Sequence, residues 1–164
     1  MVFMAENREM TREKEATSKP PVILNLYFLG FILPGFDFRL HWSTVPVWLV
    51  LAANALVFLG YIFILRVFRE NSYASTVIQV EQEQPVISSG PYALVRHPMY
   101  LGMAVIGLFS PLALGSFWAV IPALLILPSL VLRIKWEEEV LLQKLPGYQE
   151  YCSKTRFRLL PLIW

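Results

Sequence analysis

Two short clusters of polar and ring-bearing residues stand at the edges of long apolar stretches, and they hold the residue types that could do chemistry. The first cluster, residues 90–100, contains a Gly-Pro-Tyr step followed by Arg96, His97, Pro98 and Tyr100. Proline lacks an N–H and has a fixed φ, so Pro98 is expected to begin a helix. Arg96 and His97 would then lie beside unpaired N–H groups at the positive end of that helix, a place that favours an anion.

The second cluster, residues 133–139, closes the next apolar stretch from its other end, and the two clusters are predicted to form the two walls of one site. Arg133 and Glu137 are four residues apart and share one helix face, and two more glutamates follow directly, Glu138 and Glu139. Three adjacent glutamates cannot all face water at the end of a membrane helix, so at least one is expected to point inward as a functional candidate. Carboxylates and aromatic rings attract a cationic ligand, and Arg133 could hold an anionic group of a substrate. The alternative is a basic, aromatic membrane anchor beside a solvated helix face.

Several other chemistries lack the residues they need. His41 and His97 are predicted to lie on opposite sides of a membrane, and Cys152 is the one cysteine, so neither a metal site nor an internal disulfide is expected. No serine has a histidine partner in the same motif, and no glycine-rich loop suits a phosphate. The formal net charge of +2 is too small to argue for nucleic acid.

The composition predicts an all-α membrane protein. Of the 164 residues, 56% are hydrophobic and 16% are charged, whereas soluble domains are usually about 45–50% apolar and about 25% charged. A polar N-terminal tail, residues 1–20, is expected to precede a single domain, residues 21–164. About four transmembrane helices are expected in that domain, and they cover residues 21–36, 45–67, 98–113 and 116–133. Residues 21–36 are short for a span, and a re-entrant or interfacial helix is the alternative there.

The connections between these spans carry further expectations. No charge falls between residues 99 and 132, and a turn signal near Gly115 predicts a closely packed helical hairpin over residues 98–133. Asn54 is costly in lipid unless it is paired, so it is expected to face another helix. A polar loop is expected at residues 37–44, and a strand-like piece at residues 76–80 of the long connection.

The C-terminal part is expected to be a cytoplasmic helix and tail. Residues 133–145 have a helical period that should end at the Pro-Gly step of residues 146–147. With four spans, Arg39 is the one basic residue of the 14 Lys and Arg that falls on the outer side. That bias places both termini and both polar clusters in the cytoplasm.

At these residues the chain resembles the isoprenylcysteine carboxyl methyltransferase family and, more widely, the phospholipid methyltransferases. The resemblance runs from about residue 37 to the C-terminus. Its most specific parts are residues 90–92, 96–102 and 133–138, followed by Gly147, Tyr148 and Tyr151. The N-terminal region lacks the extra spans found in larger members, which puts a shared lipid-binding part in doubt.

The resemblance implies an integral membrane enzyme that uses S-adenosylmethionine on the cytoplasmic side. It implies Arg133 and Glu138 as catalytic residues, with Arg133 in contact with the substrate. The implied acceptor is lipophilic, most simply a carboxylate such as an isoprenylcysteine-like group, and membrane lipids surround the protein. The implied cofactor contacts are Gln79, Gln84, Pro85, Val86, Ile87, Tyr92, His97, Pro98, Met99, Tyr100 and Glu137.

Three other functions stay open on the sequence. An amine acceptor, as in phospholipid N-methylation, would first have to lose a proton, with Glu138 or Glu139 as the acceptor of that proton. A related membrane reductase would use NADPH, but the acidic residue expected after the Tyr-x-Gly step is replaced by Met103. A small membrane carrier without enzymatic activity would use the carboxylates for ion or partner contacts.

Overall fold

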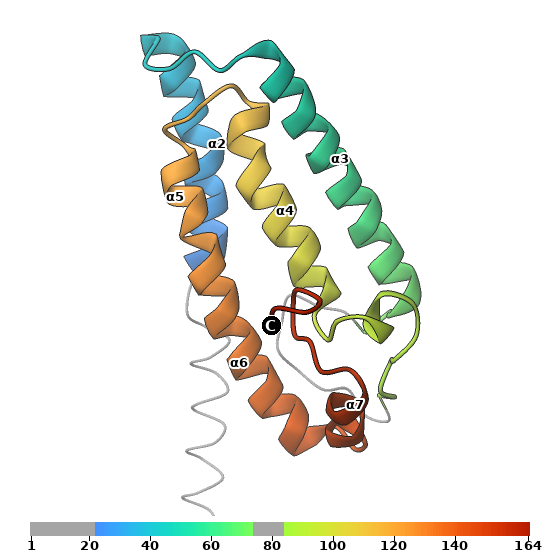
Figure 1. Cartoon of the computed structure of the whole chain (residues 1–164). Coiled ribbons are helices and arrows are strands. Elements are labelled where there is room, and N and C mark those ends of the chain that lie inside the picture. Colours follow the sequence, from blue (N-terminus) through green and yellow to red (C-terminus); the bar gives the residue numbers. More distant parts are fainter. Residues whose placement is uncertain (1–21, 74–83) are drawn as a thin grey trace, which may run out of the picture.

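Every regular element in the described part of the chain, residues 22–73 and 84–164 of the computed structural model, is a helix (Figure 1). The predicted all-α class is therefore confirmed for these residues. The predicted tail, the strand-like piece at residues 76–80 and the candidate contact Gln79 lie outside them. The helices are α2 (Val22–Leu40), α3 (Val47–Glu70), the short 3-10 helix η1 (Gly90–Ala93), α4 (Pro98–Ala113), α5 (Val120–Leu124), α6 (Ile126–Lys144) and α7 (Tyr148–Lys154).

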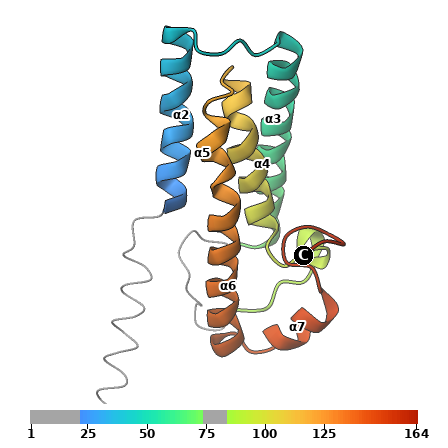
Figure 2. The same ribbon diagram turned by 60° about the vertical axis from the view of Figure 1, so that its left-hand side comes forward.

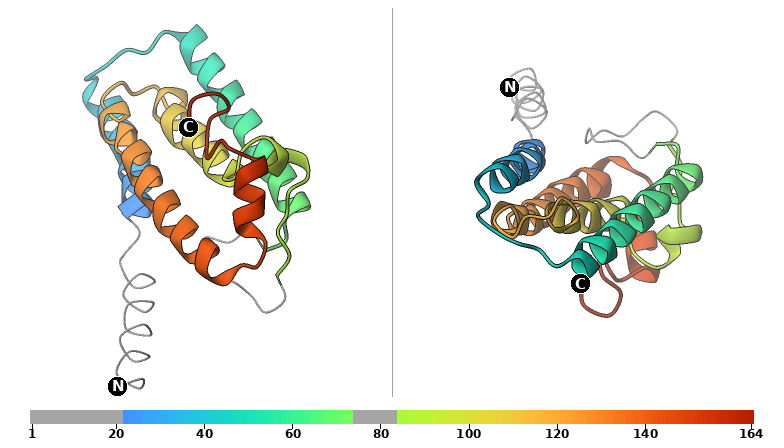
Figure 3. Two further views of the ribbon diagram at one scale, coloured as in Figure 1. Left: turned by 60° about the horizontal axis from the view of Figure 1, so that its bottom comes forward. Right: turned by 90° about the horizontal axis from the view of Figure 1, so that it is seen from above.

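The helix α4 is the centre of the bundle. It packs against α2, α3, α5 and α6, and from above it lies between α3 and the α5–α6 pair (Figure 3). The long helices run side by side, and α7 lies across their lower end (Figure 2). Most of the buried side chains of the core belong to α4, α6 and α7, for example Tyr100, Leu130 and Tyr148. The two polar clusters of the sequence thus begin α4 and continue α6 at the same end of the bundle.

Close packing of α3 and α4 depends on glycine. A Cβ atom added to Gly102 would overlap the side chain of Ile64, and one added to Gly60 would lie 2.9 Å from Cγ1 of Ile106. Real Cβ atoms do not approach so closely, so the two backbones could not keep their present separation with larger residues.

We expect Gly102→Ala to lower the free energy of unfolding by about 1–3 kcal/mol, because the extra methyl overpacks this contact. The matched control is Gly35→Ala in α2, where no described atom lies within 4 Å of the added carbon. Thermal unfolding in detergent, followed by tryptophan fluorescence, measures both variants. Equal destabilisation by the two substitutions would contradict the expected role of Gly102.

The helix α2 is longer than predicted, and the predicted polar loop at residues 37–44 is wrong for its first part. The helix continues through Pro34 to Leu40. Asp37 is 1% exposed, and its carboxylate accepts hydrogen bonds from the backbone N–H of Ser43 at 2.8 Å and from the hydroxyls of Ser43 and Ser116. These bonds satisfy a buried carboxylate inside the helix, and they join α2 to the turn between α4 and α5.

The second half of the hairpin was predicted as a single helix over residues 116–133, but the structure has two helices there. It is divided at Leu125 into α5 and α6, between Pro122 and Pro128, the two prolines expected to disturb it. The helix α6 then continues past Arg133 to Lys144. The second polar cluster is therefore part of the same helix as the apolar stretch before it.

Two local expectations agree with the structure. Nδ2 of Asn54 donates to the carbonyl of Ala113 at 3.2 Å, so Asn54 does face another helix. The helix α6 ends before the Pro-Gly step, and Gly147 has a φ of 83°, which favours glycine.

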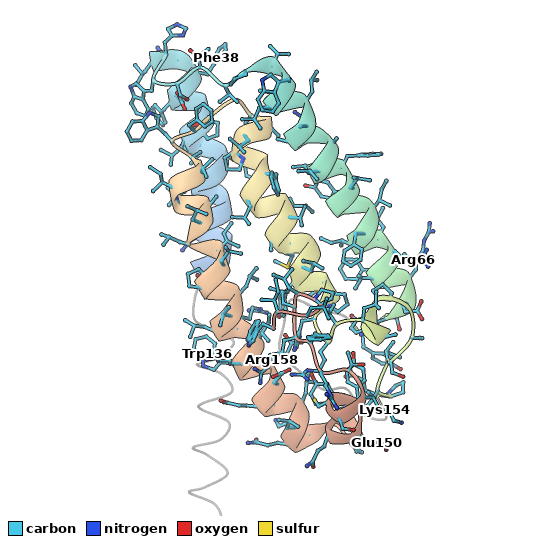
Figure 4. The ribbon with its side chains drawn as sticks, viewed as in Figure 1. Phe38, Arg66, Trp136, Glu150, Lys154 and Arg158 are labelled. Atoms are coloured by element: carbon cyan, nitrogen blue, oxygen red, sulfur yellow. The ribbon has the colours of Figure 1, made fainter. Side chains whose placement is uncertain are left out.

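One helix in the described part of the chain is long and apolar enough to cross a membrane, and this is α3. Only 11% of its apolar window is buried within the protein, and large side chains such as Trp48, Leu51 and Phe58 are exposed along it. An apolar surface of this kind suits lipid. Phe38 lies at one end of the bundle, while Glu150, Lys154 and Arg158 lie near the other (Figure 4).

Candidate active site

The loop before α4 is fixed to the end of α3. Gly90 has a φ of 55°, and a side chain there would collide with the carboxyl group of Glu70. The hydroxyl of Ser89 donates a hydrogen bond to the same carboxylate. Tyr92 follows in η1, and its carbonyl accepts a hydrogen bond of 2.7 Å from the hydroxyl of Tyr151 in α7. The Gly-Pro-Tyr step is thus held between α3 and α7.

Two backbone N–H groups just before α4 are bonded to the C-terminal segment of the chain. The N–H of Arg96 donates to the carbonyl of Phe157, and the N–H of His97 donates to the carbonyl of Arg158, both at 2.9 Å. The segment after α7 folds back over the lower end of α4 to make these bonds (Figure 3). The N–H groups of Arg96 and His97 themselves are thus satisfied by carbonyls of the chain, and an anion place at the first turn of α4 beside these residues stays a prediction.

Tyr100 links the two polar clusters through its hydroxyl. The hydroxyl donates to Oε2 of Glu137 at 2.5 Å and accepts from Nε of Arg133 at 2.8 Å. The guanidinium carbon of Arg133 lies 5.8 Å from the centre of the Tyr100 ring. The ring of His97 is stacked on the same tyrosine ring, with 5.8 Å between the two ring centroids. The tyrosine ring is 1% exposed, so it holds Arg133 and Glu137 at fixed positions one helical turn apart.

Glu138 is the centre of a buried group of charges. It is 5% exposed. Its Oε1 accepts from Nε of Arg96 at 2.7 Å and lies 3.4 Å from Nε2 of His97, and its Oε2 accepts from Nε of Arg158 at 2.6 Å. Burial alone would raise the pKa of Glu138, but hydrogen bonds from His97, Arg158 and Arg96 outweigh it and hold the pKa at about 2. Glu138 is therefore ionised throughout the neutral range.

A cleft lies between the loop before η1, the start of α4, the second half of α6 and α7. It encloses about 770 Å³ of empty space, part of it open to solvent. Most of the cofactor contacts predicted from the sequence come together in its lining. These residues are Gln84, Pro85, Val86, Ile87, Tyr92, His97, Met99, Tyr100 and Glu137.

The structure places the remaining predicted residues outside this lining. Pro98 is buried at the first position of α4, and Arg133 and Glu138 contact the lining through Tyr100 and His97. No group of three His, Cys, Asp or Glu side chains suited to a metal ion occurs in residues 22–73 and 84–164.

The lining also contains residues that were not predicted as site residues. Asn71 and Tyr73 follow α3, and no sequence signal marks them. Arg96 is next to the predicted contact His97 in the sequence. Val140, Leu141 and Leu145 were predicted only as apolar positions of a helix. The full set is Asn71, Tyr73, Arg96, Val140, Leu141, Leu145, Tyr148 and Tyr151.

Tyr148 has an unusual hydroxyl in this lining. The side chain is 4% exposed, and its oxygen has no nitrogen or oxygen partner among the described residues. Burial raises the pKa of Tyr148, so the hydroxyl keeps its proton at neutral pH and can donate. A buried hydroxyl without a partner costs about 1–3 kcal/mol, which a ligand in the cleft would relieve.

We expect Tyr148→Phe to leave the stability of the ligand-free protein unchanged or slightly higher, and to weaken ligand binding about 3–10-fold. Tyr151→Phe is the matched comparison, because its hydroxyl bonds the buried carbonyl of Tyr92. That variant should instead lose about 1 kcal/mol of stability. Thermal unfolding with and without the ligand measures both, and a stability loss in Tyr148→Phe equal to that in Tyr151→Phe would exclude the assigned role.

The fold and the site define a class of protein, a helical membrane protein with a polar cleft at one end of its bundle. Comparison with family models matches residues 48–149 to the phospholipid methyltransferase family. The chain belongs to this family, whose members are membrane methyltransferases. No curated protein gives a significant match.

Comparison with solved structures supports the same fold. A structure of the eukaryotic intramembrane Ras methyltransferase ICMT, an isoprenylcysteine carboxyl methyltransferase, matches with a TM-score of 0.62 and 21% sequence identity. The match covers 87% of this chain and 51% of the other, so this chain spans about half the length of that enzyme. At this identity the likeness describes the fold.

Proposed function

We propose that this protein is an integral membrane methyltransferase that uses S-adenosylmethionine and methylates a lipophilic acceptor, most simply a carboxylate. The observation that carries the proposal is the cleft at the start of α4. It unites Tyr100 and Glu137 with His97 and with the unpartnered hydroxyl of Tyr148. All four of these residues lie in the segment that matches the family.

The residues of the cleft suit the groups of S-adenosylmethionine. The carboxylate of Glu137 and the tyrosine rings favour a cation, and Val86 and Leu141 offer apolar surface to an adenine ring. The hydroxyl of Tyr148 can donate to a polar atom of the ligand. The bound cofactor would supply an already activated methyl group.

We propose that the predicted contacts in the lining hold this cofactor, and that Gln79 joins them from outside the described residues. Pro98 contributes by beginning the helix that carries Met99 and Tyr100. The chain's own task is then to position two reactants and to exclude water, because the transferred group needs no further activation.

Arg133 is the residue we propose for the acceptor. It lies one turn closer than Glu137 to the apolar part of α6, and its Nε already donates to Tyr100. An acceptor carboxylate bound by the guanidinium would therefore lie beside the wall of the cleft. A carboxylate is a nucleophile without loss of a proton, so no base is needed in this case.

The acceptor class is where the two comparisons differ. The matching family is described by phospholipid methylation, and the similar structure is a carboxyl methyltransferase. An amine acceptor needs a base, and Glu138, with a pKa of about 2, is a weak one. The weak basicity of Glu138 favours a carboxylate as the acceptor. We propose that Glu138 instead holds Arg96 and His97 in place.

We also propose that α2, α3, α4 and the α5–α6 pair each cross the membrane, with both termini and the cleft in the cytoplasm. The support is the distribution of basic residues and the exposed apolar side chains of α2, such as Phe28, Phe31 and Phe36. Labelling of single cysteines from each side of sealed vesicles tests this arrangement.

Isothermal titration of the purified protein with S-adenosylmethionine and with NADPH tests the cofactor. Binding of NADPH alone would favour the reductase, and binding of neither would favour the carrier. Transfer of a labelled methyl group to a panel of lipophilic acceptors then tests the acceptor. We expect labelling of prenylated cysteine carboxylates, whereas labelling of phosphatidylethanolamine alone would assign an amine acceptor.

A further inference from the structure

The last ten residues of the chain lie outside the segment that matches the family, residues 48–149, yet they bond two residues that line the cleft, Arg96 and His97. Carbonyl groups of this tail, residues 155–164, accept the N–H groups of Arg96 and His97, as described above. Nη1 of Arg96 also donates to the carbonyls of Thr155 and Arg156, at 3.0 and 3.2 Å. The tail is thus bonded directly to the residues that begin α4.

Arg158 is the side chain of this tail that enters the charged group around Glu138. In Figure 4 it lies in the space between α6 and the start of α4. Its Nε bonds Oε2 of Glu138 at 2.6 Å, and its guanidinium carbon lies 5.3 Å from the centre of the Trp164 ring. The carbonyl of Trp164 accepts the N–H groups of Leu159 and Leu160, at 2.9 and 3.1 Å. A closed turn at the C-terminus therefore holds Arg158 against Glu138.

The two oxygens of Glu138 have different partners. Arg158 occupies Oε2, and Arg96 and His97 share Oε1. Because a carboxylate with these neighbours can only accept, Nε2 of His97 must carry a proton. In the neutral imidazole this leaves Nδ1 as an acceptor, on a ring that lines the cleft.

We infer that Arg158 is a positioning residue of the site, which fixes the Glu138 carboxylate so that His97 keeps its proton on Nε2 and offers Nδ1 to donor groups of a ligand. Without the guanidinium of Arg158, Oε2 loses its partner and the carboxylate can turn away from His97. The inference rests on the proposed function for its effect on cofactor binding. The charged and titratable groups around His97 are Glu138, which its ring contacts, Tyr100, on which the ring is stacked, and Arg96 and Arg158, which bond the same Glu138 carboxylate.

The test compares Arg158→Gln with Arg156→Gln in the full chain. Both substitutions remove one positive charge from the same tail, but the side chain of Arg156 is exposed and that of Arg158 is 35% exposed and bonds Glu138. Arg158→Lys keeps a cation for Glu138 and should restore most of the function. Protein labelled with ¹⁵N-histidine reports the tautomer through its ring nitrogens. His41, the second histidine, is removed by His41→Asn, which its φ of 53° tolerates.

We expect the ligand-free protein to show the Nε2–H tautomer, retained in Arg156→Gln and Arg158→Lys, and a mixture of tautomers in Arg158→Gln. The dissociation constant for S-adenosylmethionine should rise about tenfold in Arg158→Gln, the size of one charge-assisted hydrogen bond. A single Nε2–H tautomer in Arg158→Gln would overturn the inference, as would a mixture with unchanged affinity. If the unmodified protein binds no S-adenosylmethionine, the proposed function fails, and the tautomer measurement alone then decides the positioning role.

Discussion

Glu138→Ala is expected to lower the free energy of unfolding by about 3–5 kcal/mol, the usual effect of breaking a buried ion pair from one side. The substitution leaves Arg96, whose side chain is 8% exposed, without its carboxylate, and it removes the anion beside Arg158. An unpaired guanidinium that is shielded from water is costly, because no described carboxylate replaces Glu138 at these bonds. Denaturant unfolding in detergent, followed by tryptophan fluorescence, measures the change.

Glu139→Ala is the matched control for this prediction. The two residues are neighbours on α6, and the substitution is chemically the same, but Glu139 is exposed. Its loss should change stability by no more than about 0.5 kcal/mol. Similar effects from the two variants would show that Glu138 does not organise the charges at the start of α4.

The same carboxylate gives the unmodified protein a pH dependence with a definite sign. The pKa of Glu138 is lowered from an ordinary value of 4.5 to about 2 in the folded protein. The folded state therefore binds this proton less readily than the unfolded state, and the stabilisation is complete above about pH 4.5. Stability should fall as the pH is lowered from about 4.5 to about 2. In Glu138→Ala this component of the acid-induced loss should be absent.

Residues with a strong local rule could be placed from the sequence. Pro98 begins α4 because proline lacks an N–H, and α6 ends at Lys144 because the following Leu145 precedes Pro146 and is extended. Asn54 was expected to meet another helix because an amide in an apolar span needs a partner, and it bonds α4. In each case the physical constraint acts within a few residues of the position itself.

The features that could not be predicted depend on contacts between distant segments. Asp37 was expected in a loop, but Ser116, 79 residues away, helps to satisfy its buried carboxylate. Arg158 was predicted to be a charge of the tail at the membrane interface, but in the structure the tail folds back and Arg158 bonds Glu138. Nothing in the spacing of either residue encodes its partner, since each pair forms only when the folded chain brings two distant segments together.

The site was partly predictable for the same reason. The two polar clusters were expected to meet, and the bonds of Tyr100 to Arg133 and Glu137 join them. Tyr148 was quoted only as part of a motif, because its unpartnered hydroxyl is a property of the cleft and not of the motif. The bonds from the N–H groups of Arg96 and His97 to the tail were not predicted, because the tail is too far along the chain for a helix-start rule to include it.

Glu137→Gln is expected to raise the dissociation constant for S-adenosylmethionine about tenfold or more, because a hydrogen bond or contact with a charged group is worth about 1.5–3 kcal/mol. The amide keeps an oxygen that can still accept from Tyr100, so the wall of the cleft should keep its shape. Isothermal titration measures the affinity, and Glu139→Gln is the control with the same loss of charge at an exposed position.

The ligand can be varied together with Glu137. S-adenosylhomocysteine lacks the sulfonium charge, so if the carboxylate of Glu137 acts on that charge, its removal should weaken binding of S-adenosylmethionine more than binding of S-adenosylhomocysteine. An equal loss of affinity for the two ligands would indicate that Glu137 contacts a part of the cofactor other than the sulfonium. His97→Ala should also weaken both ligands, because its ring lines the cleft. Unchanged affinity in both Glu137→Gln and His97→Ala would rule out this cleft as the cofactor site, since neither the wall formed by α6 nor the start of α4 would then contribute to binding.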